Sequence, residues 1–389
     1  MPTIKDFQNF FSQTNASILQ DIQTVTEYLT QKYHAKCYVV GGAVRDCLLG
    51  RACKDYDIEC FGMDVEDFEK AMADLGAQGV GKSFFVYKYH DLDISLPRTE
   101  QKVSPGHRGF EVHLATEEKE ASKRRDFTIN ALMYDIQNEQ ILDFWNGLGD
   151  LEHKLLRVVD KNSFTEDSLR VLRAMQFAAR FGFKVEEKSC LLCQSISLDD
   201  LPKERLFIEF EKMFRGRYLH YGLYYLSALG IAEKLFTGKF FNNKMEKKTF
   251  ISLSRQLQKN QNNFLEKLRP YYFLFICKSY FPIDIQEVLE RLGTPGSYSK
   301  KIVTTAIPDR VTVSFIANLS LKEGIEEYVG NYHPAVIAMA NKLNVWDKPF
   351  DRGVTPAQLM AEGFSGKALG DELERRTQNK INRLKEKVL

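Results

Sequence analysis

Three carboxylates alternate with other residues in the segment KDYDIECFG, residues 54–62. Strand side chains alternate between faces, so a strand here would place Asp55, Asp57 and Glu59 together on one face. Two carboxylates at i and i+2 suit a divalent cation such as Mg²⁺, which takes oxygen ligands and keeps water and substrate phosphates in its shell. A solvated strand face explains the same pattern equally well in isolation. The neighbouring segments must therefore decide between these two interpretations.

Upstream, the segment YVVGGAVRDCLLG (residues 38–50) predicts a strand, a Gly-Gly turn and a helix. Gly41 and Gly42 allow backbone N–H groups to approach a ligand closely, and a helix N-terminus favours anions. A phosphate would sit at this turn, with Arg45 one helical turn further on. A Gly-Gly pair also serves as a plain tight connection, so the turn alone leaves both interpretations open. Together with paired carboxylates, however, it indicates phosphoryl transfer, which needs one element to place a triphosphate and another to hold neutralising ions.

A second acidic strand is predicted in HDLDISLPRTE, residues 90–100. Asp91 and Asp93 lie in one phase and apolar residues in the other, so either aspartate is placed to complete the carboxylate cluster from an adjacent strand. His90 and Asp91 also form the dipeptide of HD phosphohydrolases. That chemistry expects the pair on a helix with further His and Asp ligands, so the strand pattern disfavours it.

Two further segments carry charges that suit a nucleotide. KRRDFTINAL (residues 123–132) sets three basic residues at a helix start, where the helix dipole disfavours them unless an anion lies nearby; a solvated basic turn is the alternative. In the helical segment of residues 164–183, Asp167, Arg170 and Arg173 are spaced by three and share one face. An Asp beside an Arg either pairs internally or presents an acceptor next to a donor. The second arrangement complements the Watson–Crick edges of cytosine and adenine and mismatches those of uracil and guanine.

The elements that must position these residues change character near Asp150. Before it, we expect an amphipathic helix over residues 3–33, helices over 43–49 and 65–75, and strands over 37–40, 56–61, 84–89, 92–96 and 110–114. After it, helical periodicity dominates, and residues 355–389 predict two helices joined by a Gly-rich turn, the second long and basic. The expected fold is a mixed sheet with flanking helices, followed by helical modules.

Length and composition indicate how many domains the chain can form and which environment suits it. A chain of 389 residues with 44% hydrophobic residues is long enough for several domains. The seven cysteines lie in apolar or mixed contexts and no apolar run reaches membrane-spanning length, which indicates a reduced, cytoplasmic, soluble protein. Residues 1–150 carry 16 Lys and Arg against 24 Asp and Glu, whereas residues 151–389 carry 38 against 28. An acidic first part suits cations and a basic remainder suits polyanions, although chance distribution on solvated surfaces gives the same totals.

In order and content, these motifs resemble those of the class II tRNA nucleotidyltransferases, the CCA-adding enzymes, and the related bacterial poly(A) polymerases. The matching segments are GGAVRD (41–46), DYD (55–57), RRDFTINAL (124–132), DFWNGLGDLEHKLLR (143–157), EDSLRVLR (166–173) and KERLFIEFEKMF (203–214). The resemblance implies an elongated, seahorse-like α+β protein with a nucleotidyltransferase sheet of about five strands. Its parts would be a catalytic head (1–150), a base-reading neck (151–220), a helical body (221–310) and a helical, tRNA-binding tail (311–389).

The resemblance also implies roles for individual residues. The catalytic carboxylates would be Asp55, Asp57 and Asp93, and two Mg²⁺ ions would bind to Asp55 and Asp57. The incoming nucleotide would be bound by Gly41, Gly42, Arg45, Arg125, Asp126, Asn130, Asp167, Arg170 and Arg173. Among these, Asp126 and Asn130 would lie around the sugar, and Asp167 and Arg170 would read the base. Asp143 would adjust the pocket between C and A addition, and the segment around Glu209 would brace the neck.

Four features depart from or qualify this pattern. Gln176 stands where many relatives carry a further Arg, and Asp93, which aligns best with the third head carboxylate, is not assigned as a metal ligand. Glu59 shares the face of Asp57 but matches no required position. Residues 99–123 are long enough to contain the flexible loop that A addition needs.

The implied activity is template-independent addition of CCA to the 3′ end of tRNA from CTP and ATP, with release of pyrophosphate. A-only addition and poly(A) synthesis are the alternatives within this enzyme class, although poly(A) polymerases usually carry a longer basic C-terminal extension. A catalytically silent tRNA-binding protein is the alternative from another class, and it would not need paired metal ligands. The expected partners are the tRNA 3′ end, CTP and ATP, with no membrane, and the expected state is a monomer or weak homodimer.

Overall fold

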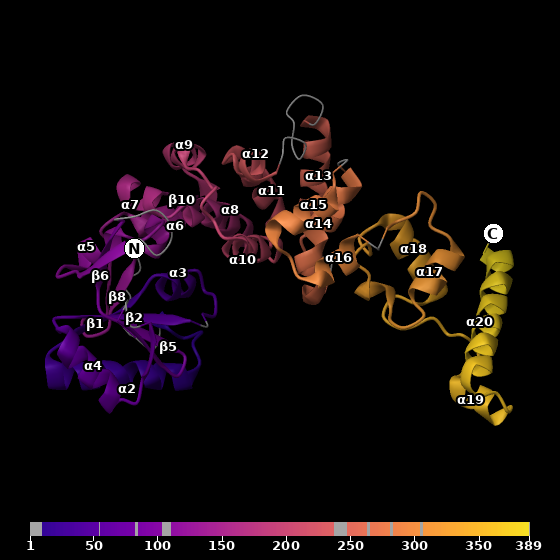
Figure 1. The fold of residues 1–389 in the computed structure, drawn as a ribbon, viewed down its shortest axis with the longest axis horizontal. Coiled ribbons are helices and arrows are strands. Elements are labelled where there is room, and N and C mark those ends of the chain that lie inside the picture. Colours follow the sequence, from indigo (N-terminus) through magenta and orange to yellow (C-terminus); the bar gives the residue numbers. More distant parts are fainter. Residues whose placement is uncertain are drawn as a thin grey trace. The chain divides into compact units, whose positions relative to one another are not determined.

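The computed structural model describes residues 10–53, 55–81, 85–102, 110–236, 247–262, 265–280, 283–303 and 306–388. The chain divides into two compact units. The first comprises Met1–Ala178 with Phe183–Leu201, and the second comprises Ala179–Gly182 with Pro202–Leu389. Figure 1 shows that the described strands belong to the first unit, whereas the second is helical.

A seven-stranded mixed sheet forms the centre of the first unit, with the strand order β3-β4-β5-β2-β1-β8-β9. Its strands are β1 (Lys36–Val40), β2 (Tyr56–Phe61), β3 (Gln78–Gly81), β4 (Val86–Tyr89), β5 (Leu92–Ser95), β8 (Met133–Asp135) and β9 (Gln140–Leu142). Neighbouring strands are antiparallel except β2 and β5, which are parallel. A parallel pair requires a crossover, which here consists of helix α4 (Val65–Asp74) and the β3–β4 hairpin.

The sheet differs from the sequence-based expectation in its number of strands, seven rather than about five. Strands β8 and β9 were not predicted because three residues are too few to show a period, and β3 was not predicted because two of its four residues are glycines. The predicted strand over residues 110–114 forms as β7 (Phe110–Leu114), but it pairs with β6 (Arg98–Lys102) in a separate two-stranded sheet. The flexible loop was expected within residues 99–123, of which residues 103–109 lie outside the described residues.

One face of the main sheet is covered by α2 (Ala16–Tyr33), α3 (Gly42–Leu48) and α4, which share a hydrophobic core with it; α2 and α4 lie together on this side in Figure 1. Strand β2 contributes Tyr56, Ile58 and Cys60 to this core. The predicted helices over 43–49 and 65–75 are confirmed. Within the predicted helix over residues 3–33, α2 begins at Ala16, where the Asn15 side chain caps it by accepting from the Ser17 N–H; residues 1–9 lie outside the described residues.

The other face of the sheet carries the polar residues of β2 and a smaller apolar cluster that includes Phe61 and Ala121. The segments that follow in the first unit are α5 (Glu118–Lys123), η1 (Thr128–Asn130), α6 (Gly147–Glu152), β10 (Leu155–Leu156), α7 (Lys161–Glu166), α8 (Leu169–Phe181), β11 (Lys184–Val185) and α9 (Glu187–Ser195). Helix α8 continues into the short segment Ala179–Gly182 of the second unit. Because side chains alternate along β2, the main sheet has a buried apolar face and an opposite face that holds Asp57 and Glu59.

The second unit consists of helices in its described residues. They are α10 (Lys203–Phe214), α11 (Leu219–Ala228), α12 (Ile231–Leu235), α13 (Lys247–Lys259), η2 (Glu266–Leu268), α14 (Arg269–Tyr280), α15 (Ile285–Leu292), α16 (Gly296–Ile302), α17 (Val313–Leu319), η3 (Ile325–Glu327), α18 (Pro334–Leu343), α19 (Pro356–Ala361) and α20 (Gly366–Val388). The ring of Phe214 stacks on Phe273 at a centroid distance of 5.5 Å and joins α10 to α14. The predicted pair of C-terminal helices is confirmed as α19 and α20.

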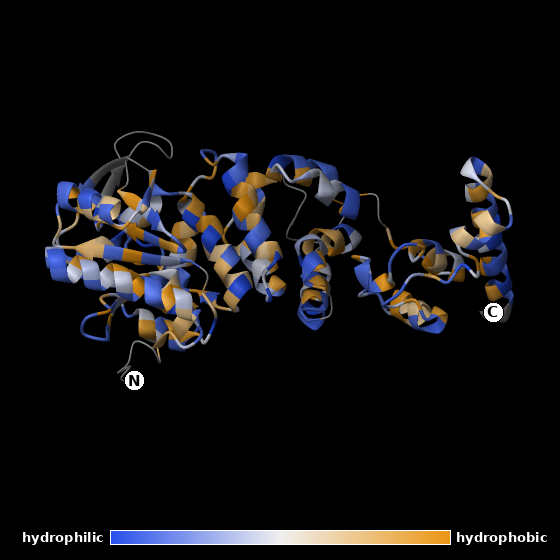
Figure 2. Ribbon diagram, turned by 90° about the horizontal axis from the view of Figure 1, so that it is seen from below, coloured by the Kyte–Doolittle hydropathy of each residue, from blue (hydrophilic) through white to orange (hydrophobic). Residues whose placement is uncertain are grey.

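The distribution of hydrophobic residues along the chain agrees with this packing. In Figure 2 the strands of the main sheet and most helices show hydrophobic and hydrophilic residues side by side. Among the described residues, no helix is both long enough and apolar enough to cross a membrane. All seven cysteines are free thiols.

Candidate active site

The acidic strands meet at the parallel pair of the sheet. Asp57 on β2 and Asp93 on β5 are directly opposite one another in the register. Asp55 immediately precedes β2 and is exposed, and Asp57 is half-buried. The structure therefore brings two of the three predicted carboxylates together, with Asp55 two residues before Asp57 on the same chain segment.

Asp57 lies in an environment that disfavours its negative charge. Burial raises the pKa of Asp57 above its ordinary value; the attraction of Arg125 opposes this rise, and the neighbouring carboxylates of Asp93 and Glu59 add to it. A cation bound beside these carboxylates would stabilise their negative charge, which burial and mutual repulsion both disfavour.

The donor set suits Mg²⁺ better than it suits a closed metal site. In the described part of the chain, no group of three or more His, Cys, Asp or Glu side chains is arranged to hold a metal ion. Mg²⁺ usually binds through one or two carboxylates plus substrate phosphates, so the aligned Asp57 and Asp93 fit that mode without a third protein ligand. The HD alternative finds no support here, since the exposed His90 contacts Asp21 through Nδ1 at 3.0 Å and lies between two strands.

The predicted phosphate turn joins β1 to α3. Gly41 has φ 69° and ψ −122°, a backbone conformation that essentially only glycine adopts. Arg45 does not project into solvent, because it is 4% exposed and its Nε donates to Asp46 Oδ1 at 2.9 Å. Its Nη1 also donates to Asn130 Oδ1, so the turn is fastened to the predicted sugar-binding segment.

That segment is itself fastened to α8. Asp126 is 5% exposed and accepts from Asn130 Nδ2 at 2.8 Å and from Arg173 Nε at 2.6 Å. The guanidinium of Arg173 lies over the ring of Phe177 at 4.9 Å, and that of Arg45 lies over the same ring at 5.4 Å. Five predicted or neighbouring residues thus form one chain of contacts, which runs Asp46, Arg45, Asn130, Asp126, Arg173.

Arg125 is held by a residue to which sequence reasoning gave no role. Glu59 is 2% exposed, and its Oε1 accepts from Nη2 of both Arg124 and Arg125 at 2.7 Å. Burial would lower the pKa of Arg125, but the carboxylates of Glu59 and Asp57 raise it above its ordinary value. On the other side, a Cβ on Gly41 would lie 2.9 Å from Arg125 Nη1. The alternation of β2 predicts that Glu59 lies on the face of Asp57. The basic pair Arg124 and Arg125, later in the chain, was the sequence signal that could have identified the partner of Glu59.

Arg170 is bound to the backbone. Its Nη1 donates to Ser163 O and its Nη2 to Arg124 O, each at 2.6 Å, which fixes the plane of the guanidinium beside the basic segment. Asp167 precedes α8, and its Oδ1 accepts from the Leu169 N–H at 3.2 Å. The two predicted base-reading residues therefore lie at the start of α8, and Arg170 contacts the backbone of Arg124.

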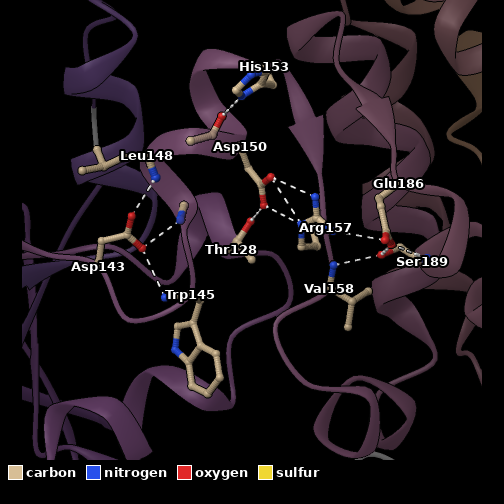
Figure 3. Close-up of polar contacts among 12 residues, drawn as sticks. Thr128, Asp143, Trp145, Leu148, Asp150, His153, Arg157, Val158, Glu186 and Ser189 are labelled. Atoms are coloured by element: carbon tan, nitrogen blue, oxygen red, sulfur yellow. Dashed lines mark hydrogen bonds and ion pairs between the residues drawn. The ribbon is translucent and has the colours of Figure 1, made fainter. Parts of the chain in front are cut away.

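Asp143 lies further along the chain, as Figure 3 shows. It accepts from the backbone N–H groups of Trp145, Gly147 and Leu148 at 3.3, 2.8 and 3.0 Å, so it organises the start of α6. These contacts join Asp143 to the local backbone, and none of its hydrogen bonds among the described residues reaches the chain of contacts from Asp46 to Arg173.

A second network in Figure 3 supports the segment that carries Asp126. Asp150 is 2% exposed; it accepts from Thr128 Oγ1 at 2.7 Å and from Arg157 Nε at 3.1 Å. Arg157 Nη1 also donates to Glu186 Oε1 at 3.1 Å. The motif of residues 143–157 contained Asp150 and Arg157, yet no sequence argument singled them out, because their partners lie in other segments.

Gln176, the departure on α8, is 1% exposed, and its Oε1 has no hydrogen-bond partner among the described residues. Glu209 on α10 is 2% exposed and accepts from Lys212 at 2.7 Å within the second unit. Glu209 is thus a buried carboxylate of that unit.

Two segments of the chain match known protein families. Residues 37–157 match the family described as the poly A polymerase head domain, and residues 182–243 match the probable RNA and SrmB-binding site of polymerase A.

Solved structures share the fold over nearly the whole chain. A CCA-adding enzyme in complex with ATP has a TM-score of 0.65 and 23% identity, with 98% of this chain and 94% of that chain covered. The Thermotoga maritima CCA-adding enzyme complexed with tRNA-CCA has a TM-score of 0.67 and 23% identity, with coverages of 98% and 95%. The Bacillus stearothermophilus CCA-adding enzyme in complex with CTP has a TM-score of 0.62 and 20% identity, with coverages of 94% and 93%. The chain therefore carries segments that match the poly A polymerase head domain and the RNA-binding site of polymerase A, on a fold shared with CCA-adding enzymes, in agreement with the resemblance that its motifs indicated.

Proposed function

We propose that this protein adds C, C and A to the 3′ end of tRNA, using CTP and ATP without a nucleic-acid template and releasing pyrophosphate. The observation that carries the proposal is the chain of contacts from Asp46 to Arg173. It joins the Gly-Gly turn, the RRDFTIN segment and α8, three segments far apart in sequence. Arg125, which precedes Asp126, links them to the acidic strand through Glu59.

The nucleotide would bind where these segments meet. Two Mg²⁺ ions, held by Asp55 and Asp57 with Asp93 beside them, would neutralise the triphosphate and lower the pKa of the attacking hydroxyl. Arg45, Arg125 and the Gly41–Gly42 backbone orient the triphosphate, and Asp126 and Asn130 surround the sugar. The 3′-hydroxyl of the tRNA then attacks the α-phosphate in line, and pyrophosphate leaves.

Base choice is assigned to Asp167 and Arg170, with Arg173 as a further nucleotide contact. Their place at the start of α8 supports this, because the backbone bonds of Arg170 give a planar donor a fixed direction. Asp143 would adjust the pocket through the start of α6, whose backbone it holds.

The tRNA would be gripped by the basic remainder of the chain. Residues 151–389 carry ten more basic than acidic side chains, 38 against 28, so binding should weaken steeply with salt. In this proposal the head is residues 1–150, the neck 151–220, the body 221–310 and the tail 311–389. A cytoplasmic location and a monomer or weak homodimer remain predictions.

The test is addition to defined tRNA ends. Purified protein is incubated with transcripts that end before CCA, after C or after CC, with each labelled nucleotide in turn. Growth by three, two and one nucleotides, respectively, supports the proposal. Growth of only the CC-ending transcript, by one A, indicates an A-adding enzyme, and long A tails indicate a poly(A) polymerase. No growth with any nucleotide would overturn the proposal.

A further inference from the structure

Glu59 bridges two adjacent guanidinium groups inside the first unit. Its Oε1 accepts from Arg124 and from Arg125 at the same distance, 2.7 Å, and its side chain is 2% exposed. A carboxylate oxygen that already accepts from two arginines is poorly placed to bind a metal ion as well. Glu59 therefore acts on the site through the arginines rather than as a further ligand.

Its position on β2 makes this contact consequential for Asp57. The two residues are separated by one position and lie on the same face of the strand, and the carboxylates of both attract Arg125. If the charge of Glu59 were removed, Asp57 would be the remaining strand carboxylate that attracts this guanidinium. An ion pair between Arg125 and Asp57 would neutralise the carboxylate that is aligned with Asp93 for a cation.

The opposite side of Arg125 is confined by the Gly-Gly turn. Its Nη1 lies 2.9 Å from the place that a Cβ on Gly41 would occupy, so the guanidinium fills the space that this glycine leaves open. Glu59 and Gly41 together hold Arg125 between the acidic strand and the turn.

We propose that Glu59 is a positioning residue that keeps Arg125 beside Gly41 and away from Asp57. The guanidinium then serves the triphosphate, and the Asp57 carboxylate is left for the divalent cation. The assignment of the triphosphate as ligand rests on the function proposed above, whereas the separation of Arg125 from Asp57 does not.

The experiment measures Mn²⁺ binding without nucleotide, from the electron paramagnetic resonance signal of free Mn²⁺, which prefers the same oxygen donors as Mg²⁺. Glu59→Gln keeps the shape and removes the charge, and is expected to weaken Mn²⁺ binding about tenfold or more. Glu59→Asp keeps the negative charge and should retain most of the wild-type Mn²⁺ affinity. The double variant Glu59→Gln with Arg125→Gln should also recover wild-type Mn²⁺ affinity, since the competing cation is gone.

A merely structural role of Glu59 would not produce that recovery. Asp135→Asn is the matched control, because Asp135 is a 5% exposed carboxylate of the same sheet whose described hydrogen bonds go to Gln137 and Asn138. It should leave Mn²⁺ binding unchanged. Should Glu59→Gln not fold, Arg125→Gln alone still tests the idea, since it should bind Mn²⁺ at least as tightly as the wild type while raising the KM for CTP.

Two results would overturn the proposal: wild-type Mn²⁺ affinity in folded Glu59→Gln, or weak Mn²⁺ binding that persists in the double variant. Because the Mn²⁺ measurement needs neither tRNA nor CTP, it remains decisive even if the protein adds no CCA. In an active enzyme, Glu59→Gln should also raise the KM for CTP about tenfold with a smaller effect on kcat at saturating Mg²⁺.

Discussion

Gly41 offers a stringent test of the site because its backbone and its surroundings both require glycine. Its φ of 69° and ψ of −122° lie in a region that residues with a side chain rarely adopt. A Cβ at this position would also lie 2.9 Å from Arg125 Nη1 and 3.6 Å from Asn130 O. Gly41→Ala should therefore affect both the stability of the first unit and the position of Arg125.

The magnitude follows from comparison with two other glycines of the same segment. Gly41→Ala should lower the free energy of unfolding by about 1–3 kcal/mol, the usual cost of a non-glycine residue in such a conformation. Gly50 has φ 63° and nothing within 4 Å of its Cβ position, so Gly50→Ala isolates the backbone cost at about 1–2 kcal/mol. Gly42 begins α3 with only an ordinary 3.5 Å contact to Arg45, so Gly42→Ala should be neutral or stabilise by up to about 1 kcal/mol.

Urea unfolding followed by tryptophan fluorescence measures these differences. The chain has two tryptophans, and a Trp346→Phe background leaves Trp145 as the reporter of the first unit. Trp145 suits this purpose because its Nε1 donates to Ser122 Oγ at 2.9 Å. The KM for CTP in each folded variant then reports on Arg125 and should rise about tenfold in Gly41→Ala but not in Gly50→Ala.

Equal stability of Gly41→Ala and Gly42→Ala would refute the backbone argument. A destabilised Gly41→Ala with an unchanged KM for CTP would refute the claim that Arg125 depends on the space beside this glycine. One set of variants thus tests the backbone cost at Gly41 and the position of Arg125 separately.

Three other variants test the remaining parts of the site. Asp57→Asn should slow single-turnover C addition at least about a hundredfold, whereas Asp91→Asn, an exposed carboxylate two residues before Asp93, should not; comparable rates in both would contradict the metal assignment. Asp167→Ala should raise incorporation of UTP relative to CTP by about 10- to 100-fold, from about 1–3 kcal/mol of lost discrimination; unchanged base preference in a folded variant would show that Asp167 does not read the base. Burial would raise the pKa of Asp126, but Arg173 and the hydrogen bonds from Asn130 and Arg173 hold it below its ordinary value, so Asp126→Asn should cost about 3 kcal/mol at pH 7. The lowered pKa of Asp126 in the folded state stabilises the fold at pH values above the pKa of the unfolded state, and this stabilisation is lost as the pH falls through the folded-state pKa. The difference in the free energy of unfolding between wild type and Asp126→Asn should therefore shrink below about pH 4. A difference that stays constant with pH in unfolding titrations would contradict this account.

Local patterns sufficed for much of the fold. The alternation in β2, the helical period of α4 and the paired C-terminal helices could be predicted, because each is set by neighbours within one turn or one strand. Strands β8 and β9 could not, since each spans three residues and is defined by pairing with other strands. The same holds for β7, whose pattern is a strand's but whose partner is β6 rather than the main sheet.

For the site, the sequence by itself determined which kinds of side chain are available: carboxylates in alternation, a Gly-Gly turn, a basic pair, and an Asp and Arg one helical turn apart. It could not show that Asp57 lies opposite Asp93, because register between strands is decided by packing over long separations. Nor could it show that Glu59 binds Arg124 and Arg125, or that Arg45 reaches Asn130, since these partners are 65 to 85 positions apart. Only the tertiary structure decided those contacts, because burial in a common core brings the charges together and makes each one depend on its partner.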